Sequence, residues 1–417
     1  MRELSTGRYA ALCVAVAAVA TAGVVFAGSP LPRLTPDSAS YLTGAEKLAH
    51  EGTFADCAGP IVLFAPGFSA AMAPLVALGV DATDAARVVN ALATLVLVLA
   101  AALLARAAGL SRNACLLAAI AVAASYATLR DGPLAWSEPL FCAILGVLLV
   151  VVVDEGRGLA AQLSARAGAA VVLTWMLLLT RHSGLFVVPA IVAAAWLGST
   201  ELARRPARTV AFALVLLAVP ALWWARDLHV DGSVFGQRSG SRFGALEVLW
   251  QLPDGVSSLA LPRALPLALR LVVLAGVLAA AALAFPASRR DARARVTVWV
   301  LSIAVVVYGL AVTGAAMRTV VDPIDTRLMS PLLVPGAVLV AISVSAGTAG
   351  LPRLLQSALR VVVLALVTAL VVLAPGVVWR GHTAERSLAN VPDDVSCADW
   401  PAQYSGGAAV GLARDPG

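Results

Sequence analysis

The sequence predicts an all-α polytopic membrane protein, and three observations indicate this fold class. Hydrophobic residues make up 60% of the 417 residues, and charged residues only 13%. The apolar residues come in blocks of about 18 to 24, each long enough to cross a bilayer core of about 30 Å as a helix. Because a bilayer offers the backbone no hydrogen-bond partners, such blocks must be helical, and the sequence lacks the alternating pattern of a transmembrane β-barrel.

The apolar blocks predict about eleven transmembrane helices. We place them at residues 9–28, 85–107, 113–130, 135–153, 164–180, 183–198, 208–225, 264–285, 296–314, 328–347 and 356–375. The block 61–80 is also apolar, but prolines interrupt it, and a crossing there would invert every later loop. We therefore expect that block to form a re-entrant or surface-lying hairpin.

The arginines between the blocks predict the orientation of the chain. They lie singly or in short clusters rather than on one basic face, which argues against nucleic acid as a partner. With the N-terminus in the cytoplasm, the short arginine-rich loops fall inside, as the positive-inside rule requires. We therefore expect a multi-pass protein of the cell membrane in which residues 1–375 form one transmembrane domain. The outer side then holds a first loop (29–84), a second large loop (226–263) and a short tail (376–417).

Two of the five cysteines fall on the predicted outer side. Cys13, Cys115 and Cys142 lie within predicted helices, where cysteine behaves as a small apolar residue. A disulfide between Cys57 and Cys397 is chemically permitted outside the cytoplasm, and two free thiols fit the sequence equally well.

The first outer loop places an acidic residue at the start of a predicted helix. Thr35 followed by Pro36 is typical of an N-cap with proline at the first helical position, which puts Asp37 in the first turn. An acidic residue there also complements the helix dipole. The position alone therefore fits both a structural and a catalytic role.

Four later segments place charged residues at outer helix ends. These residues are Glu138 after Trp136, Arg181 beside His182, Arg226 after two tryptophans, and Arg327 after Asp325. A carboxylate that enters an apolar block costs about 2–3 kcal/mol unless it is paired, so Glu138 indicates either a ligand-binding group or an ion pair. The arginines fit an anion site, although helix-end arginines also snorkel to the interface at low cost.

Taken in order, these segments resemble the GT-C glycosyltransferases. The similarity is to the polyprenyl-phosphate-sugar enzymes related to protein O-mannosyltransferases and to the aminoarabinose transferase of lipid A. It rests on Asp37 with Tyr41, on Phe64-Ala65-Pro66-Gly67-Phe68, and on the segments 136–141, 179–184, 223–226 and 325–328. The chain departs from the protein O-mannosyltransferase pattern, because Ala65 replaces a proline and no acidic pair follows the first helix.

The resemblance implies a GT-C-type bundle with surface helices in the first outer loop. It also implies an inverting transfer of a sugar from a polyprenyl-phosphate donor to a glycan, lipid or protein acceptor outside the cytoplasm. On this basis Asp37 is the catalytic base, and Arg327, Arg181 and Arg226 bind the donor phosphate. The resemblance assigns substrate binding to Tyr41, Glu138, His182 and Asp325.

A metal cofactor is only weakly indicated. Glu46 and His50 are four residues apart and would share a helix face, which fits a divalent metal as well as two solvated side chains. A lipid phosphate can leave without a metal if arginines neutralise it. We therefore assign no metal ligands.

Two alternatives from other classes stay open: a polytopic transporter, and a lipid-linked polysaccharide ligase or polymerase. Transporters typically carry ionisable residues in the middle of their helices. Here nearly all charges cluster at helix ends, with Arg270 as an exception. This distribution favours glycosyl transfer.

Overall fold

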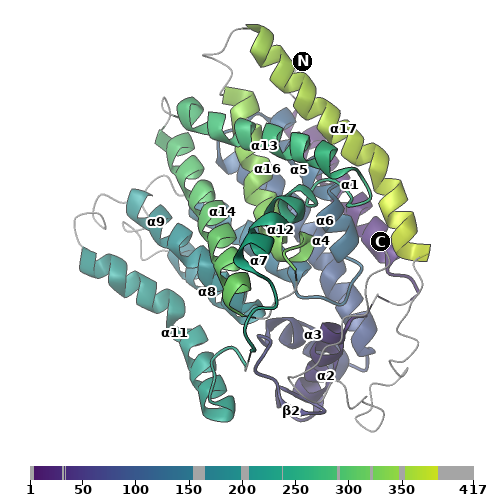
Figure 1. Ribbon diagram of the computed structural model, residues 1–417, viewed down its shortest axis with the longest axis vertical. Coiled ribbons are helices and arrows are strands. Elements are labelled where there is room, and N and C mark those ends of the chain that lie inside the picture. The colour runs from purple at the N-terminus through teal and green to yellow at the C-terminus, as the bar shows by residue number, and fades with distance from the viewer. Residues whose placement is uncertain are drawn as a thin grey trace.

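The computed structural model describes residues 4–30, 32, 34–153, 165–198, 206–236, 238–288, 292–319, 323–346 and 353–383. Within these residues the chain is helical apart from one small antiparallel hairpin, β1 (Ala55–Asp56) and β2 (Gly59–Pro60). The helices form one bundle, and the hairpin lies at one end of it (Figure 1). The predicted all-α class is confirmed.

Seven helical segments in the described residues are long and apolar enough to cross a membrane. They lie in α1 (Thr6–Ala27), α4 (Ala82–Ala107), α11 (Pro206–Asp231), α13 (Leu267–Ser288), α14 (Ala292–Arg318), Thr326–Ser345 and α17 (Arg353–Thr383). Each lies on a predicted crossing. The other four predicted crossings fall on shorter apolar helices: α5 (Arg112–Ala123), α7 (Glu138–Val153), α8 (Ala165–Thr180), and η1 (His182–Val187) with α9 (Val188–Gly198). The chain is therefore multi-pass, with seven crossings supported by helix length.

Two short helices of the first loop lie side by side at the hairpin end of the bundle (Figure 1). In α2 (Pro36–His50) the predicted cap is present, because Thr35 and Ser38 form a reciprocal capping box. The block 61–80, predicted as a hairpin, instead contains one helix, α3 (Gly67–Ala77). The Ser69 hydroxyl of α3 donates to the Tyr41 carbonyl of α2 at 2.8 Å. The two helices thus hold one another in place.

The predicted helix 113–130 is broken into α5 and a short α6 (Tyr126–Asp131). The break occurs because Ser125 caps α6, its hydroxyl accepting a hydrogen bond from the Thr128 amide at 3.2 Å. The amide of Ala127 then donates to the Leu259 carbonyl at 3.1 Å, beyond the end of α12 (Ala245–Ser257). The break thereby attaches α6 to the second outer loop.

The last helix, α17, is longer than predicted and lies along the outside of the bundle (Figure 1). It continues through Pro375 to Thr383, eight residues beyond the predicted end at 375. Proline is tolerated inside transmembrane helices because neighbouring groups satisfy the freed backbone. The remainder of the predicted tail, including Cys397 and its suggested pairing with Cys57, lies outside the described residues.

The second outer loop contains α12, which supports the segment that leads into α15 (Thr326–Met329). The Ser258 and Thr326 hydroxyls are hydrogen-bonded at 2.7 Å, and Gln251 accepts from the Ile324 amide at 2.9 Å. Arg270, the predicted mid-helix charge of α13, forms an ion pair with Asp254 of α12. Its charge is therefore balanced at the α12–α13 contact.

Candidate active site

The starts of three helices and the end of a fourth bring the predicted site residues together. Asp37 lies in the first turn of α2, Glu138 begins α7, and Arg181 follows the last residue of α8. Arg327 lies in α15, which continues through η2 (Ser330–Leu332) into α16 (Leu333–Ala346). Its guanidinium donates through Nε to Glu138 Oε1 and through Nη2 to Asp37 Oδ2. Two residues 290 positions apart thus form an ion pair.

Arg181 joins this cluster from the other side of Glu138. It pairs with the same carboxylate oxygen that accepts from Arg327, and it donates to the Ser137 hydroxyl at 3.1 Å. That hydroxyl lies 3.0 Å from the phenolic oxygen of Tyr41. Both Ser137 and Tyr41 are buried, so this polar chain is shielded from solvent. We call Asp37, Glu138, Arg181 and Arg327 the four-charge cluster.

Trp136 contacts Arg327 of the four-charge cluster and also the cap of the helix that carries Asp37. The guanidinium carbon of Arg327 lies 4.4 Å from the centre of its ring, a cation–π contact. Its indole nitrogen donates to the Thr35 hydroxyl at 2.7 Å and so contacts the cap of α2. No role was predicted for Trp136 or Ser137. Both directly precede Glu138 in the sequence, and this adjacency was the available signal.

Burial differs sharply within the four-charge cluster. The Glu138 side chain is 2% exposed and that of Arg327 is 9% exposed, whereas that of Asp37 is 28% exposed. Two carboxylates and two guanidiniums balance in charge, which offsets much of the cost of burying them. Asp37 is thus the more solvent-accessible carboxylate, and Glu138 is the buried carboxylate that contacts both arginines.

A second polar group lies next to the four-charge cluster and includes residues that sequence reasoning missed. Asp325 caps α15, its Oδ1 accepting from the Leu328 amide at 3.2 Å, and its Oδ2 lies 3.7 Å from Arg130. Arg130 also pairs with Asp131 at 2.9 Å. Burial raises the pKa of Asp131 to about 7, with Arg130 opposing the shift. An Arg-Asp pair directly after an apolar block was the signal that could have found these two residues.

One oxygen of Glu138 and one of Asp131 have no hydrogen-bond partner among the described residues. Both side chains line a cavity of about 20 Å³. A cavity of at least about 10–15 Å³ holds one water molecule. The cavity is therefore large enough for one water molecule beside two buried carboxylates.

Arg226 and His182 make their contacts away from the four-charge cluster. Arg226 donates to the Ile61 carbonyl at 2.9 Å and the Phe54 carbonyl at 3.2 Å, which attaches α11 to the first loop. His182 packs edge to face on Phe235, with ring centroids 5.1 Å apart. The structure thus brings together Asp37, Tyr41, Glu138, Arg181 and Arg327, with Asp325 beside them.

Metal ligands do not gather at this site. Among the described residues, no group of three His, Cys, Asp or Glu side chains is arranged to hold a metal ion. The positive charge near Asp37 comes from the two arginines.

The chain resembles known proteins in its fold and not in its sequence. No protein-family model matches the chain, and no curated protein matches it. The solved structure of ArnT from Cupriavidus metallidurans bound to undecaprenyl phosphate matches with a TM-score of 0.59 and 17% identity. That match covers 89% of this chain and 72% of ArnT.

Two other solved structures also match. The arabinofuranosyltransferase AftD from Mycobacteria has a TM-score of 0.52 and 20% identity, over 91% of this chain and 27% of AftD. The Archaeoglobus fulgidus oligosaccharyltransferase, in complex with zinc and sulfate, has a TM-score of 0.51 and 13% identity, over 88% of this chain and 53% of its own. The chain therefore has the fold of the GT-C glycosyltransferases over about nine-tenths of its length.

Proposed function

We propose that this protein transfers a sugar from a polyprenyl-phosphate donor to a hydroxyl group of an acceptor on the outer side of the membrane. The observation that carries the proposal is a partly exposed carboxylate, Asp37, held by the buried Arg327 beside a second arginine. A base and fixed positive charge are the two groups that such a transfer requires. The fold shared with ArnT, whose structure holds undecaprenyl phosphate, supports the donor class.

In the proposed step Asp37 accepts the proton of the acceptor hydroxyl. The acceptor oxygen forms a bond to the anomeric carbon, and the bond from that carbon to the phosphate oxygen breaks. The bonding electron pair leaves with the polyprenyl phosphate, and the configuration at the anomeric carbon is inverted. Arg327 and Arg181 stabilise the negative charge on the leaving phosphate.

The ion pair between Asp37 and Arg327 occupies the guanidinium that the proposed donor phosphate would contact. A donor phosphate that takes over contacts of Arg327 would free the Asp37 carboxylate to meet the acceptor hydroxyl. Glu138 keeps both arginines in place throughout, because it is buried and bound to both.

Replacing Asp37 tests the base directly. For Asp37→Asn we expect turnover to fall by about 10²–10⁴-fold, the usual contribution of a general base. Donor binding should stay within a few-fold of wild type, because the amide keeps the size of the side chain.

Mass spectrometry of lipids and envelope glycans from a deletion strain complemented with each variant would show an accumulated polyprenyl-phosphate sugar. Asp84→Asn, on the exposed start of α4, is the matched control and should restore the glycan. Full complementation by Asp37→Asn would refute the proposal.

Two arginine variants separate the phosphate site from an ordinary helix end. Arg327→Lys keeps the charge but loses the fork-shaped contact to two carboxylates, and we expect the donor KM to rise by about tenfold or more. Arg226→Lys is the comparison, because Arg226 binds loop carbonyls, and we expect a smaller rise in KM. An equal effect of both substitutions on donor KM would remove Arg327 from the phosphate site.

A further inference from the structure

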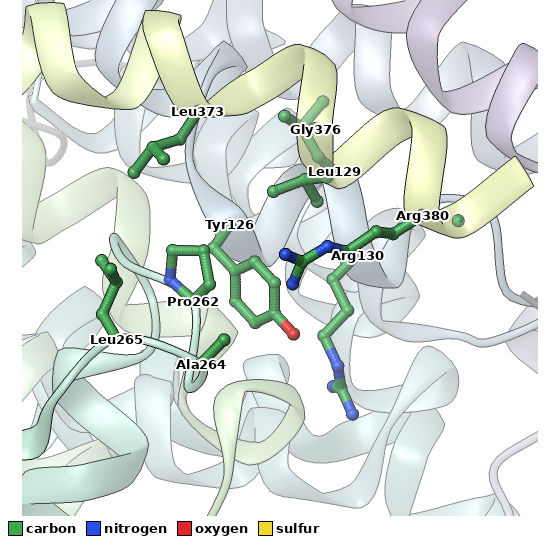
Figure 2. A pocket seen from close by; sticks show the side chains of 11 residues that line it. Tyr126, Leu129, Arg130, Pro262, Ala264, Leu265, Leu373, Gly376 and Arg380 are labelled. Atoms are coloured by element: carbon green, nitrogen blue, oxygen red, sulfur yellow. The ribbon is translucent and has the colours of Figure 1, made fainter. Parts of the chain in front are cut away.

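A basic cavity of about 310 Å³ lies beside Arg130 (Figure 2), and no residue of the four-charge cluster lines it. Its walls come from α6, from the segment 262–265 and from the last turns of α17. Tyr126, Arg130 and Arg380 supply its polar groups, and Leu129, Pro262 and Leu373 supply apolar wall. We call this space the basic cavity. The proposed reaction makes no use of it.

Arg380 gives the basic cavity its free charge. Its side chain extends from α17 toward the ring of Tyr126 (Figure 2). The Arg130 guanidinium is engaged by Asp131 and Asp325, whereas Arg380 has no hydrogen bond or ion pair within the described part of the chain. The Tyr126 hydroxyl makes no hydrogen bond there, although it lies close enough to Arg130 to interact with that guanidinium electrostatically. A guanidinium and a phenol hydroxyl that face one space are suited to an anion.

A second, apolar cavity of about 220 Å³ is lined by residues that neighbour those of the basic cavity along α6 and α17. It lies among α5, α13, α16 and α17 and is lined almost wholly by aliphatic side chains. Ser125 lines the apolar cavity, and the next residue, Tyr126, lines the basic cavity. In the same way, Leu370 of α17 lines the apolar cavity, and Leu373, one turn later, lines the basic cavity. The apolar cavity follows α5 from Ala114 to Ser125, so its long direction is that of the bundle helices.

The depth of the two cavities in the membrane can be read from α17. Trp379, beside Arg380, is 60% exposed, and tryptophan is enriched at the headgroup level of a membrane. Val361, Val362 and Leu364, farther along the same helix, are more than half exposed and face the lipid chains. The basic cavity therefore lies at headgroup depth, and the apolar cavity lies at hydrocarbon depth beneath it.

We infer that these two cavities together bind a membrane lipid with an anionic phosphate head. The phosphate contacts Arg380 and the Tyr126 hydroxyl, and one hydrocarbon chain occupies the apolar cavity. The lipid head then lies against Arg130, which in turn contacts Asp325 at the cap of the helix that carries Arg327. This inference is independent of the proposed glycosyl transfer, because its binding groups are separate from the four-charge cluster.

The test is native mass spectrometry of the purified full chain in detergent with added lipid. The probes are phosphatidylglycerol, phosphatidylcholine with the same acyl chains, polyprenyl phosphate, and inorganic phosphate alone. We expect Arg380→Gln to weaken binding of the anionic lipid by about tenfold, the usual size of one charge-assisted contact. Arg318→Gln, at the exposed end of α14 and away from both cavities, is the matched control and should bind as wild type.

A separate variant tests whether a hydrocarbon chain occupies the apolar cavity. Gly336 lines the apolar cavity, and a Cβ there meets nothing within 4 Å, so Gly336→Phe fills the cavity without a backbone clash. We expect it to reduce lipid binding, whereas Gly309→Phe, equally open but on α14 away from the cavities, should not.

The outcomes distinguish a lipid-linked substrate from a membrane phospholipid, and some of them would contradict the inference. Tighter retention of polyprenyl phosphate than of phosphatidylglycerol would identify a lipid-linked substrate, and equal retention would identify a membrane phospholipid. Equal binding of phosphatidylcholine, or wild-type binding by Arg380→Gln, would overturn the inference. Full displacement by inorganic phosphate, together with no effect of Gly336→Phe, would reduce the site to a phosphate site without a lipid chain.

Discussion

Among single residues, the buried carboxylates near the site differ in how their charge is balanced. Glu138 is contacted by two guanidiniums, whereas Asp131 has one close arginine and lies near two other carboxylates. Burial raises the pKa of Asp131 to about 7, Arg130 lowers it, and Asp325 and Glu138 raise it further. Asp131 ends α6, outside the seven candidate spans. It therefore changes charge near neutral pH.

Asp131→Asn is predicted to flatten the pH dependence of stability. The carboxyl binds its proton more tightly in the folded state, where its pKa is about 7, than in the unfolded state, where it is 3.8. Its contribution to stability is therefore present at low pH and is lost as pH rises toward 7. In detergent the wild-type melting temperature should fall more between pH 5 and pH 8 than that of Asp131→Asn. Asp131→Glu, which still titrates, should keep a fall of the same sign. Identical slopes for wild type and Asp131→Asn would contradict the prediction.

The sequence could not predict which groups each site side chain contacts. Arg226 and Arg327 both stand at predicted outer helix ends, and nothing local distinguishes them. In the structure the first contacts loop carbonyls and the second contacts two carboxylates. The difference depends on how the first loop folds back on α11, which is a long-range contact. Asp37, by contrast, was located correctly within its helix because the Thr35 cap is a local signal.

At the level of secondary-structure elements, short capped helices carry the site on the ends of long apolar ones. Thr35 caps α2 and Asp325 caps α15, and these two caps fix where Asp37 and Arg327 lie. Long apolar helices were predictable from composition, because seven blocks crossed a simple length threshold. The α5–α6 break was missed, since the alanines around Ser125 continue the apolar pattern and a single serine is a weak signal. The helix α12 was missed within a loop that contains proline and glycine.

The contact between α3 and α8 depends on one glycine. A Cβ at Gly67 would lie 2.7 Å from the Leu179 carbonyl oxygen and 2.8 Å from the Thr180 hydroxyl. This close approach seats the first-loop helices on the end of α8, next to Arg181. The Pro66-Gly67 turn of the sequence is thus a packing requirement as well as a turn.

Gly67→Ala is accordingly predicted to destabilise the protein by about 1–3 kcal/mol, the usual cost of overpacking. The measurement is thermal unfolding of purified protein in detergent. Gly276→Ala on α13, where a Cβ meets nothing within 4 Å, is the control and should be neutral or stabilising, because alanine favours a helix more than glycine does. A melting temperature of Gly67→Ala equal to wild type would show that α3 can shift away from α8 at no cost.

At the scale of the whole molecule, the first and second loops contact one another. This contact holds whichever side of the membrane the loops face. Arg226 of α11 donates to the carbonyls of Phe54 and Ile61, so the first and second loops meet at one end of the bundle. Arg112 instead contacts the Leu4 carbonyl, joining the start of α5 to the residues before α1. The site and the start of α5, where Arg112 lies, are therefore at opposite ends of the bundle, and the positive-inside rule then predicts that the site faces out.

Cysteine labelling in intact cells checks this orientation. In a background without the native cysteines, Thr53→Cys and Ser239→Cys should react with a membrane-impermeant maleimide, because both residues are exposed and lie in the loops predicted to face out. Ser111→Cys, exposed at the start of α5, should react only after the cells are permeabilised. The cysteine-free parent gives the background. Because Arg226 joins the first loop to α11, labelling of Thr53→Cys and Ser239→Cys from different sides would contradict the fold itself. Labelling of both only after permeabilisation would keep the fold and reverse the orientation, which would place the proposed transfer on the cytoplasmic side.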